Sequence, residues 1–365
     1  MSARTRRRTA AAITLTAAVT AGAALLTGCG PTSAAAATVA APTTPGGTQS
    51  GVPGTAPSSA VSTPATAPGT APSGTTATPG APATPTGAAP VRSTAPARNG
   101  TAHNGLTISN GTTRVLMNGT SVDFHTVVRD LAWSPDGSRA AFIDGAGNLD
   151  TANPDGSGRV LVAVAPGGQS WSHPTWQVRA ADAQYQLPLK NNIIFAAAQG
   201  GVSRLETVPA TAVHGTPTTL SLDAEGGMPA DAPPQTGNTW PNGGGKYGNA
   251  VYANSNGDVY VRDDYLREQV SMVTAGSQPA LSPDAMTVAF VRSVDGHDHI
   301  FRSSWDHKAT DLTPHATTDY TEPTWSPDGK TLAVRTPHGV ATLPSDGSAA
   351  PTVVSDYPGL PAYRG

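Results

Sequence analysis

The chain contains one cysteine, Cys29, and the residues before it define the chemistry open to its thiol. Cys29 follows Leu26, Thr27 and Gly28, so a leucine is succeeded by two small residues. A cysteine thiolate is a nucleophile, and small neighbours leave the peptide bond before it open to a peptidase. Because a single thiol cannot form an internal disulfide, we expect Cys29 to have another role.

The residues before Cys29 have the pattern of an export signal. Four arginines lie within residues 4–8, and residues 9–28 are uncharged and mostly apolar or small. With the Leu-Thr-Gly-Cys run, this segment resembles the signal and lipobox of bacterial lipoproteins. The resemblance implies a signal peptide over 1–28, cleavage between Gly28 and Cys29, and conversion of Cys29 to an N-palmitoyl, S-diacylglycerol cysteine. An ordinary secretory signal with a chance cysteine is the alternative.

Two acyl chains or more would hold such a protein stably on a membrane surface. We therefore expect a lipid-anchored protein on the extracytoplasmic face of the cell membrane. Arginine is far commoner than lysine, which fits the GC-rich genome of a high-GC Gram-positive bacterium. The general and the twin-arginine export routes both remain open.

Composition divides the rest of the chain into two parts. Residues 29–105 are almost entirely Ala, Pro, Thr, Gly and Ser, a composition that cannot bury a core and predicts a disordered tether. Residues 106–365 are long enough for a substantial core. This second part holds 16 of the 22 basic and all 25 acidic residues, a formal charge of −9. Because nucleic-acid binding needs a basic patch, we expect no nucleic-acid partner.

A short motif recurs through residues 106–365. Trp133-Ser134-Pro135-Asp136-Gly137 returns as Trp325-Ser326-Pro327-Asp328-Gly329, with a weaker copy at Leu281-Ser282-Pro283-Asp284-Ala285. Two degenerate copies are anchored at Trp176 and Trp240. The spacings between anchors are 43, 64, 41 and 44 residues, so we expect an insertion between 176 and 240. The repeat anchors are Trp133, Pro135, Asp136, Gly137, Trp176, Trp240, Leu281, Pro283, Asp284, Trp325, Pro327, Asp328 and Gly329.

Each copy predicts a four-stranded antiparallel unit. Ser-Pro-Asp-Gly suits a type I turn, because Pro presets φ at its second position and Gly suits the fourth. The turn joins a short strand carrying the tryptophan to a second strand such as Val288–Val291, and Asp-Gly turns separate two more. Such a unit cannot bury both faces alone, so several must pack around an axis, with each Trp wedged between neighbours.

The pattern P-x-W-S-P-D-G-x-x-L-A-F is close at Pro323–Val334 and at Asp130–Phe142. It resembles the TolB-like, WD40-like (PD40) propeller repeats, over about 128–355. The resemblance implies an all-β fold, a β-propeller of five or six four-stranded blades. We expect this propeller to be monomeric. Residues 106–118 read as a hairpin that completes a sixth blade or covers an edge.

Signatures of catalysis are missing from the sequence. It contains no G-x-S-x-G, H-E-x-x-H, phosphate loop or CxxC. His297 and His299 alternate onto one face of a strand and are weak metal candidates, with a polar loop as the favoured interpretation. Asn254, Asn256 and Asp258 lack the full spacing of a calcium loop and favour an ordinary turn. We therefore expect neither a metal nor a cofactor.

Three functions fit these observations. The first is a non-enzymatic scaffold that binds another protein of the cell envelope, as the TolB resemblance implies. The second is an extracytoplasmic hydrolase or lyase with a site at the channel mouth. The third is a binder of cell-wall carbohydrate that uses Trp171, Trp305 or Tyr320. The insertion over 209–245 is either a binding loop or a disordered excursion.

Overall fold

The computed structural model describes residues 97–224, 232–265 and 269–365. The expected signal peptide, its cleavage site at Gly28, the lipidation site Cys29 and the tether up to residue 96 lie outside the described residues. Within these three ranges every regular element is a β-strand. The same ranges contain no helix long and apolar enough to cross a membrane.

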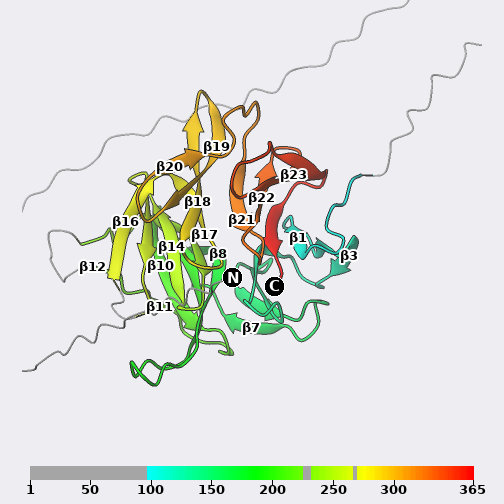
Figure 1. Ribbon diagram of the computed structural model, residues 1–365. Helices are drawn as coiled ribbons and strands as arrows, with labels where there is room; N and C mark the ends of the chain where they lie inside the picture. The colour runs from blue at the N-terminus through cyan, green and yellow to red at the C-terminus, as the bar shows by residue number, and fades with distance from the viewer. Residues whose placement is uncertain (1–96, 225–231, 266–268) are drawn as a thin grey trace, which may run out of the picture. The chain divides into compact units, whose positions relative to one another are not determined.

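The described strands form six sheets, the blades of a β-propeller (Figure 1). The first blade consists of β25 (Leu360–Tyr363), β1 (Leu106–Ser109), β2 (Arg114–Met117) and β3 (Thr120–Asp123), from the centre outward. The second consists of β4 (Arg129–Trp133), β5 (Ala140–Ile143), β6 (Leu149–Ala152) and β7 (Val160–Ala163). The third consists of β8 (Gln169–Arg179), β9 (Lys190–Gln199), β10 (Val202–Pro209) and β11 (Thr218–Thr219).

The remaining three blades follow in chain order. The fourth consists of β13 (Asn238–Gly244), β14 (Asn249–Asn254), β15 (Asp258–Arg262), β16 (Gln269–Ala275) and the parallel strand β12 (Asp223–Ala224). The fifth consists of β17 (Ser277–Leu281), β18 (Thr287–Val294), β19 (His297–Ser304) and β20 (Ala309–Asp311). The sixth consists of β21 (Thr321–Trp325), β22 (Thr331–Thr336), β23 (Gly339–Pro344) and β24 (Thr352–Ser355). The predicted propeller is confirmed, with six blades.

The ring is closed by strands from opposite ends of the described chain. β25 pairs with β1 in antiparallel register, with Thr107 opposite Ala362, and the Thr107 hydroxyl donates to the Ala362 carbonyl over 2.9 Å. In Figure 1 the red C-terminal strand therefore lies beside the cyan strands of the first blade. The hairpin expected over 106–118 is the middle of a complete blade whose innermost strand lies some 250 residues later in the sequence.

The Ser-Pro-Asp-Gly segments form the predicted turns. In the copy after β21, the Gly329 N–H donates to the Ser326 carbonyl over 2.9 Å, and the Ser326 hydroxyl donates to the Asp328 carboxylate over 2.6 Å. In the weaker copy, Ala285 takes the place of glycine and still adopts a left-handed φ of 57°. The aspartates of these turns are therefore hydrogen-bond acceptors within the turn.

The tryptophans that end the innermost strands bind neighbouring blades together, as predicted. The indole N–H of Trp325 donates to the Ala280 carbonyl of the preceding blade over 2.9 Å. Trp176 donates in the same way to the Ala132 carbonyl over 3.2 Å. Each ring lies in an apolar cluster with residues of that blade, so the hydrophobic core runs around the propeller between its blades.

The insertion between the third and fourth blades follows their outer edges. Gly215 forms a bridge with Ala163 of the second blade, and β11 then becomes the outer strand of the third. Leu220 and Leu222 are buried against Tyr252 and other residues of the fourth blade. The part of the insertion from 209 to 224 therefore serves as an outer layer of the sheets.

Candidate functional site

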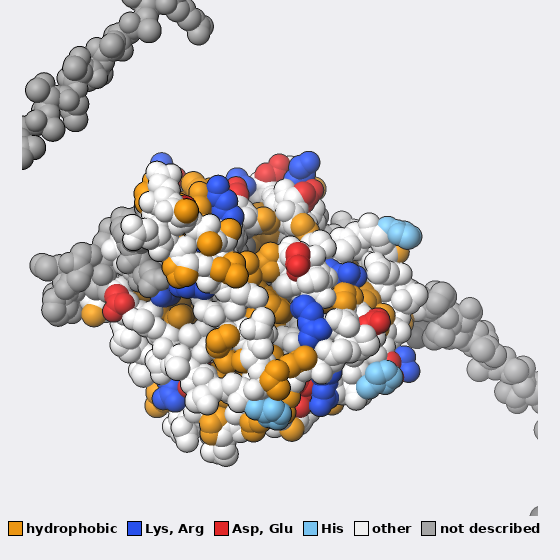
Figure 2. All heavy atoms as spheres, turned by 90° about the horizontal axis from the view of Figure 1, so that it is seen from below, with side chains coloured by type: hydrophobic (Ala, Val, Ile, Leu, Met, Phe, Trp, Pro, Cys, Tyr) orange, Lys and Arg blue, Asp and Glu red, His pale blue; other side chains and the backbone are white. Residues whose placement is uncertain are grey.

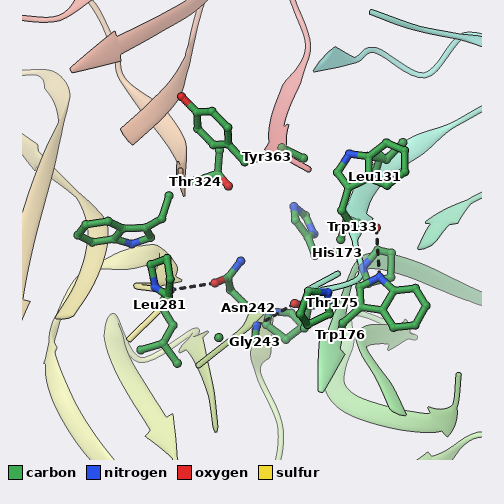
Figure 3. A pocket seen from close by; sticks show the side chains of 18 of the residues that line it. Leu131, Trp133, His173, Thr175, Trp176, Asn242, Gly243, Leu281, Thr324 and Tyr363 are labelled. Atoms are coloured by element: carbon green, nitrogen blue, oxygen red, sulfur yellow. Dashed lines mark hydrogen bonds between the residues drawn. The ribbon is translucent and has the colours of Figure 1, made fainter. Parts of the chain in front are cut away.

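A cavity with a volume of about 460 Å³ lies at the centre of the propeller. Residues from the innermost strands of all six blades line it, namely β25, β4, β8, β13, β17 and β21. Figure 3 shows side chains from these strands around the hollow, with His173 pointing into its middle. The ring closure described above therefore builds the site, because each blade contributes one wall.

Aligning the six innermost strands by their hydrogen-bond register reveals a four-residue pattern. In each blade, the last residue of this pattern pairs with a buried residue near the start of the second strand, as Trp325 pairs with Leu332. The six segments are Asp130–Trp133, His173–Trp176, Trp240–Gly243, Gln278–Leu281, Glu322–Trp325 and Leu360–Tyr363.

This register corrects one predicted anchor and adds another. Gly243 of the fourth blade stands where Trp133, Trp176, Leu281 and Trp325 stand in other blades, so the anchor expected at Trp240 is shifted by three residues. The prediction was wrong there because Trp240 and Pro241 resemble the Trp of the motif and its following turn, although they lie three residues before the anchor position. The sixth copy ends in Tyr363, which the sequence interpretation missed.

The first residue of five of these segments has a left-handed backbone. Asp130, His173, Trp240, Gln278 and Glu322 have φ between 47° and 54°, and none is glycine. Each lies in a β-bulge where the register of the innermost strand shifts. A left-handed backbone costs such residues about 1 kcal/mol or more each, and strain of this kind gathers at functional sites.

We call these five residues and their counterpart Leu360 the channel ring. All six line the cavity, one from each blade. In five blades the next residue is proline (Pro174, Pro241, Pro279, Pro323 and Pro361), which restricts φ and removes a backbone donor. The cavity therefore has stiff walls at the level of the ring.

Hydrogen bonds between blades hold the ring in place. The Asp130 carboxylate accepts the His173 backbone N–H over 3.1 Å, and the Gln278 side-chain oxygen accepts the Glu322 N–H over 2.8 Å. Two residues further along, the Thr175 hydroxyl accepts the Gly243 N–H over 2.8 Å, as drawn in Figure 3. These contacts fix the polar side chains before any ligand arrives.

Two residues of the ring approach each other across the channel. His173 belongs to the third blade and Glu322 to the sixth, so they come from opposite sides of the propeller. Their Nε2 and Oε1 atoms are 4.0 Å apart, which is longer than a hydrogen bond. The other oxygen of Glu322 accepts from Arg335 over 3.1 Å. Burial raises the pKa of Glu322, but His173 and Arg335 lower that pKa more, so its carboxylate is ionised.

Polar atoms in the ring also lack partners within the described part of the chain. The Trp240 indole nitrogen and both ring nitrogens of His173 are buried without a hydrogen bond. The two rings meet edge to face with centroids 5.5 Å apart. Because buried polar groups are almost always satisfied, these atoms indicate a surface prepared for a ligand.

The two residues predicted as weak metal candidates contact different carboxylates. His297 contacts Asp319 over 3.2 Å, whereas His299 is buried and contacts Asp311 over 2.9 Å. Across the described ranges, no group of three His, Cys, Asp or Glu side chains is placed to hold a metal ion. The segment from Asn254 to Asp258 forms the turn between β14 and β15, as favoured from the sequence.

The aromatic residues proposed for carbohydrate binding are mostly committed to packing. Trp171 is 2% exposed and packs against Phe195 with ring centroids 4.6 Å apart, so the prediction that it is an exposed carbohydrate-binding residue is wrong. Trp305 and Tyr320 are half-buried against core clusters. The sequence interpretation missed a more exposed group, in which Tyr265 contacts Tyr247 at 4.4 Å and Tyr185 at 5.8 Å between ring centroids.

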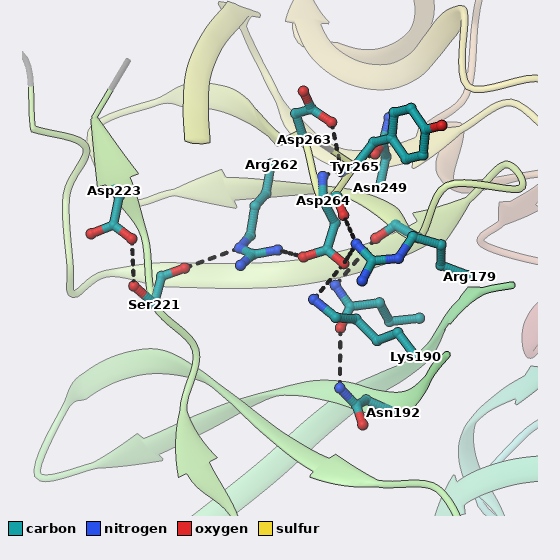
Figure 4. Close-up of polar contacts among 12 residues, drawn as sticks. Arg179, Lys190, Asn192, Ser221, Asp223, Asn249, Arg262, Asp263, Asp264 and Tyr265 are labelled. Carbon is teal, nitrogen blue, oxygen red and sulfur yellow. Dashed lines mark hydrogen bonds and ion pairs between the residues drawn. The ribbon is translucent and has the colours of Figure 1, made fainter. Parts of the chain in front are cut away.

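A buried ionic cluster joins the third and fourth blades (Figure 4). The fully buried Asp264 carboxylate contacts Arg179, Lys190 and Arg262, and the Lys190 distance is 2.6 Å. The Asn249 side chain accepts the Asp264 backbone N–H over 3.0 Å. Cations from β8, β9 and β15 thus converge on one carboxylate, which fixes the two blades that carry His173 and Trp240.

The fold resembles those of solved propeller structures. TolB from Acinetobacter baumannii matches with a TM-score of 0.50 and 15% identity, over 71% of this chain and 65% of TolB. This likeness shows that the two proteins share a β-propeller fold. Hydrazine synthase from Kuenenia stuttgartiensis matches with a TM-score of 0.51 and 15% identity, over 71% of this chain and 46% of the other. By sequence, the chain matches no protein-family model and no curated protein.

The face of the propeller drawn in Figure 2 carries acidic and basic side chains interspersed with hydrophobic ones. Charges of one sign therefore do not form a patch on this face.

The central cavity is the candidate site, because strained backbones and buried polar atoms without hydrogen bonds are concentrated there.

Proposed function

We propose that this protein is a lipid-anchored propeller on the extracytoplasmic face of the cell membrane, whose central channel binds a segment of another envelope protein. The observation that carries the proposal is the channel ring, in which five non-glycine residues keep a left-handed backbone at one level of the cavity. Bulges and strained residues of this kind are retained where they aim side chains at a ligand.

The lining of the cavity supports a peptide as the ligand. Buried prolines and tryptophans supply apolar walls, while Thr324 and Asn242 supply half-buried polar groups beside them. Such mixed lining provides contact area together with a few oriented hydrogen-bonding groups. A volume of about 460 Å³ accommodates a few side chains of an extended segment.

A photo-crosslinking experiment tests the channel. The crosslinker p-benzoylphenylalanine replaces Thr324 or Ala132, which line the cavity, or Met272, which is 47% exposed on the outer strand β16. Irradiation of intact cells should give one discrete adduct from both channel positions and none from Met272. Absence of an adduct at the channel positions, or the same adduct at Met272, would contradict the proposal.

The anchor is tested separately through Cys29. Replacement of Cys29 by alanine removes the acyl acceptor, so the protein should lose radiolabelled palmitate and leave the membrane fraction. A Cys29→Ala protein that stays in the membrane fraction would contradict the anchor but would leave the channel result untouched.

Binding of cell-wall carbohydrate is a second candidate, favoured by the tyrosine group. Tyr185 is 47% exposed, and the Tyr265 hydroxyl donates to Asp182 over 2.7 Å, which holds the group in place. Tyrosine faces with nearby carboxylates suit sugar rings. Tyr185→Ala should lower retention on purified peptidoglycan, with Tyr357→Ala as the control. Equal retention of both variants and the parent would exclude this role.

A further inference from the structure

The channel ring has an acidic character. Asp130 and Glu322 place two carboxylates at this level of the cavity. The cavity-lining residues include one lysine and no arginine: Lys246 is exposed and its ammonium lies 4.7 Å from the Tyr247 ring centroid. Lys246 follows the end of β13, whereas Trp240, the ring residue of that blade, lies in the first half of the strand. Both acidic side chains that line the cavity therefore belong to the ring.

The carboxylates retain acceptor capacity toward the cavity. Asp130 accepts one backbone N–H, that of His173, and Glu322 is paired with Arg335 through Oε2. Oε1 of Glu322 lies 4.0 Å from His173 Nε2, beyond hydrogen-bond distance. An ammonium or guanidinium group reaching this level would therefore find acceptors in place.

Trp240 adds a surface that suits a cation. It lies in the ring between His173 and Gln278 in blade order and is half-buried. Its ring contacts the imidazole of His173 edge to face at 5.5 Å between centroids. Tryptophan is the aromatic side chain that attracts cations most strongly, and partial burial strengthens that attraction. The ring thus combines carboxylates with an aromatic surface, a combination that recognises lysine or arginine.

We propose that the channel ring binds a lysine or arginine side chain of the segment that occupies the channel, with Glu322 and Asp130 as its acceptors. The inference rests on the proposed function for the identity of the ligand as a protein segment. It extends that function by giving the chemical class of the side chain that the centre of the propeller binds.

The test compares two capped pentapeptides, each with one central residue flanked by glycines. One carries arginine and the other carries citrulline, a neutral group of nearly the same shape. Binding to the full chain is followed through the indole N–H signals in NMR, with the Trp240 signal assigned from Trp240→Phe. The arginine peptide should bind with a Kd of about 1–10 mM, and the citrulline peptide about tenfold more weakly.

Two variants locate the effect. Glu322→Gln should weaken binding of the arginine peptide about tenfold, and Asp130→Asn should weaken it less, because an amide oxygen still accepts the His173 N–H. Asp130→Asn also keeps the test valid if Glu322→Gln fails to fold. Glu206→Gln, a buried carboxylate paired with Arg204 on β10, is the matched control and should bind unchanged.

Three results would overturn the inference. They are equal affinity for the arginine and citrulline peptides, no shift of the Trp240 signal with either peptide, and unchanged binding by both ring variants. The outcome is separable from that of the crosslinking experiment. A discrete channel adduct without discrimination between the peptides retains the proposed function and rejects the cation site. Discrimination between the peptides without a channel adduct retains the cation site and rejects the proposed function.

Discussion

Replacing Trp325 tests whether contacts between blades hold the propeller together. Trp325 is 9% exposed, packs in a cluster shared by β17, β18 and β22, and donates its indole N–H to the Ala280 carbonyl. Trp325→Phe keeps most of the apolar area but leaves that carbonyl without its donor. Loss of one hydrogen bond to a buried acceptor, with a small cavity, costs about 1–2 kcal/mol of unfolding free energy.

Trp325→Ala removes the ring entirely and should cost about 4 kcal/mol. For a folded unit of this size, each kcal/mol lowers Tm by about 2 °C, so the expected shifts are about 3 °C for phenylalanine and about 8 °C for alanine. Thermal and urea unfolding of the full chain, followed by near-ultraviolet circular dichroism, measures both.

Trp305→Phe is the matched control, because Trp305 is half-buried at the edge of its cluster. Its Tm should change by less than about 1 °C, as is usual away from special features. The reasoning would be refuted if Trp325→Phe were as stable as the parent, or if Trp305→Phe lost as much stability.

Three other predictions concern single positions. Burial raises the pKa of Asp150 from its ordinary 3.8 to about 6, so its ionisation destabilises the fold as pH rises through that interval. Asp150→Asn should therefore be about 2–3 kcal/mol more stable at pH 7 and no more stable at pH 4, in urea unfolding at both pH values. Gly243→Ala should lose about 3 kcal/mol by the same measurement, because a Cβ there would lie 2.2 Å from the Trp176 carbonyl oxygen of the neighbouring blade. Asp284→Ala should lose about 1 kcal/mol, since its carboxylate accepts the Ser282 hydroxyl over 2.6 Å and the Met286 N–H over 3.0 Å. A stable Gly243→Ala protein would argue against the close blade contact, and an unchanged Asp284→Ala would argue against the role of the turn.

The tertiary structure decided the candidate site. The channel ring contains Asp130, His173, Trp240, Gln278 and Glu322, five different residue types of which only Asp130 and Glu322 have side chains of the same chemistry. Their common property is a bulge that forms only when the innermost strand pairs with its neighbour. A proline after four of these five residues was the one signal in the sequence, and it marks the position without revealing the left-handed backbone.

The sequence by itself determined the three blades that contain a Ser-Pro-Asp turn, because adjacent residues specify such a turn. Trp133-Ser134-Pro135-Asp136-Gly137 and its copies therefore predicted the hairpins and the packing of tryptophan between blades. Only the tertiary structure decided how many blades close the ring, that β25 pairs with β1, and that His173 faces Glu322 across the channel. These contacts join residues far apart in the chain, and their geometry follows from closing six twisted sheets around one axis rather than from any local residue pattern.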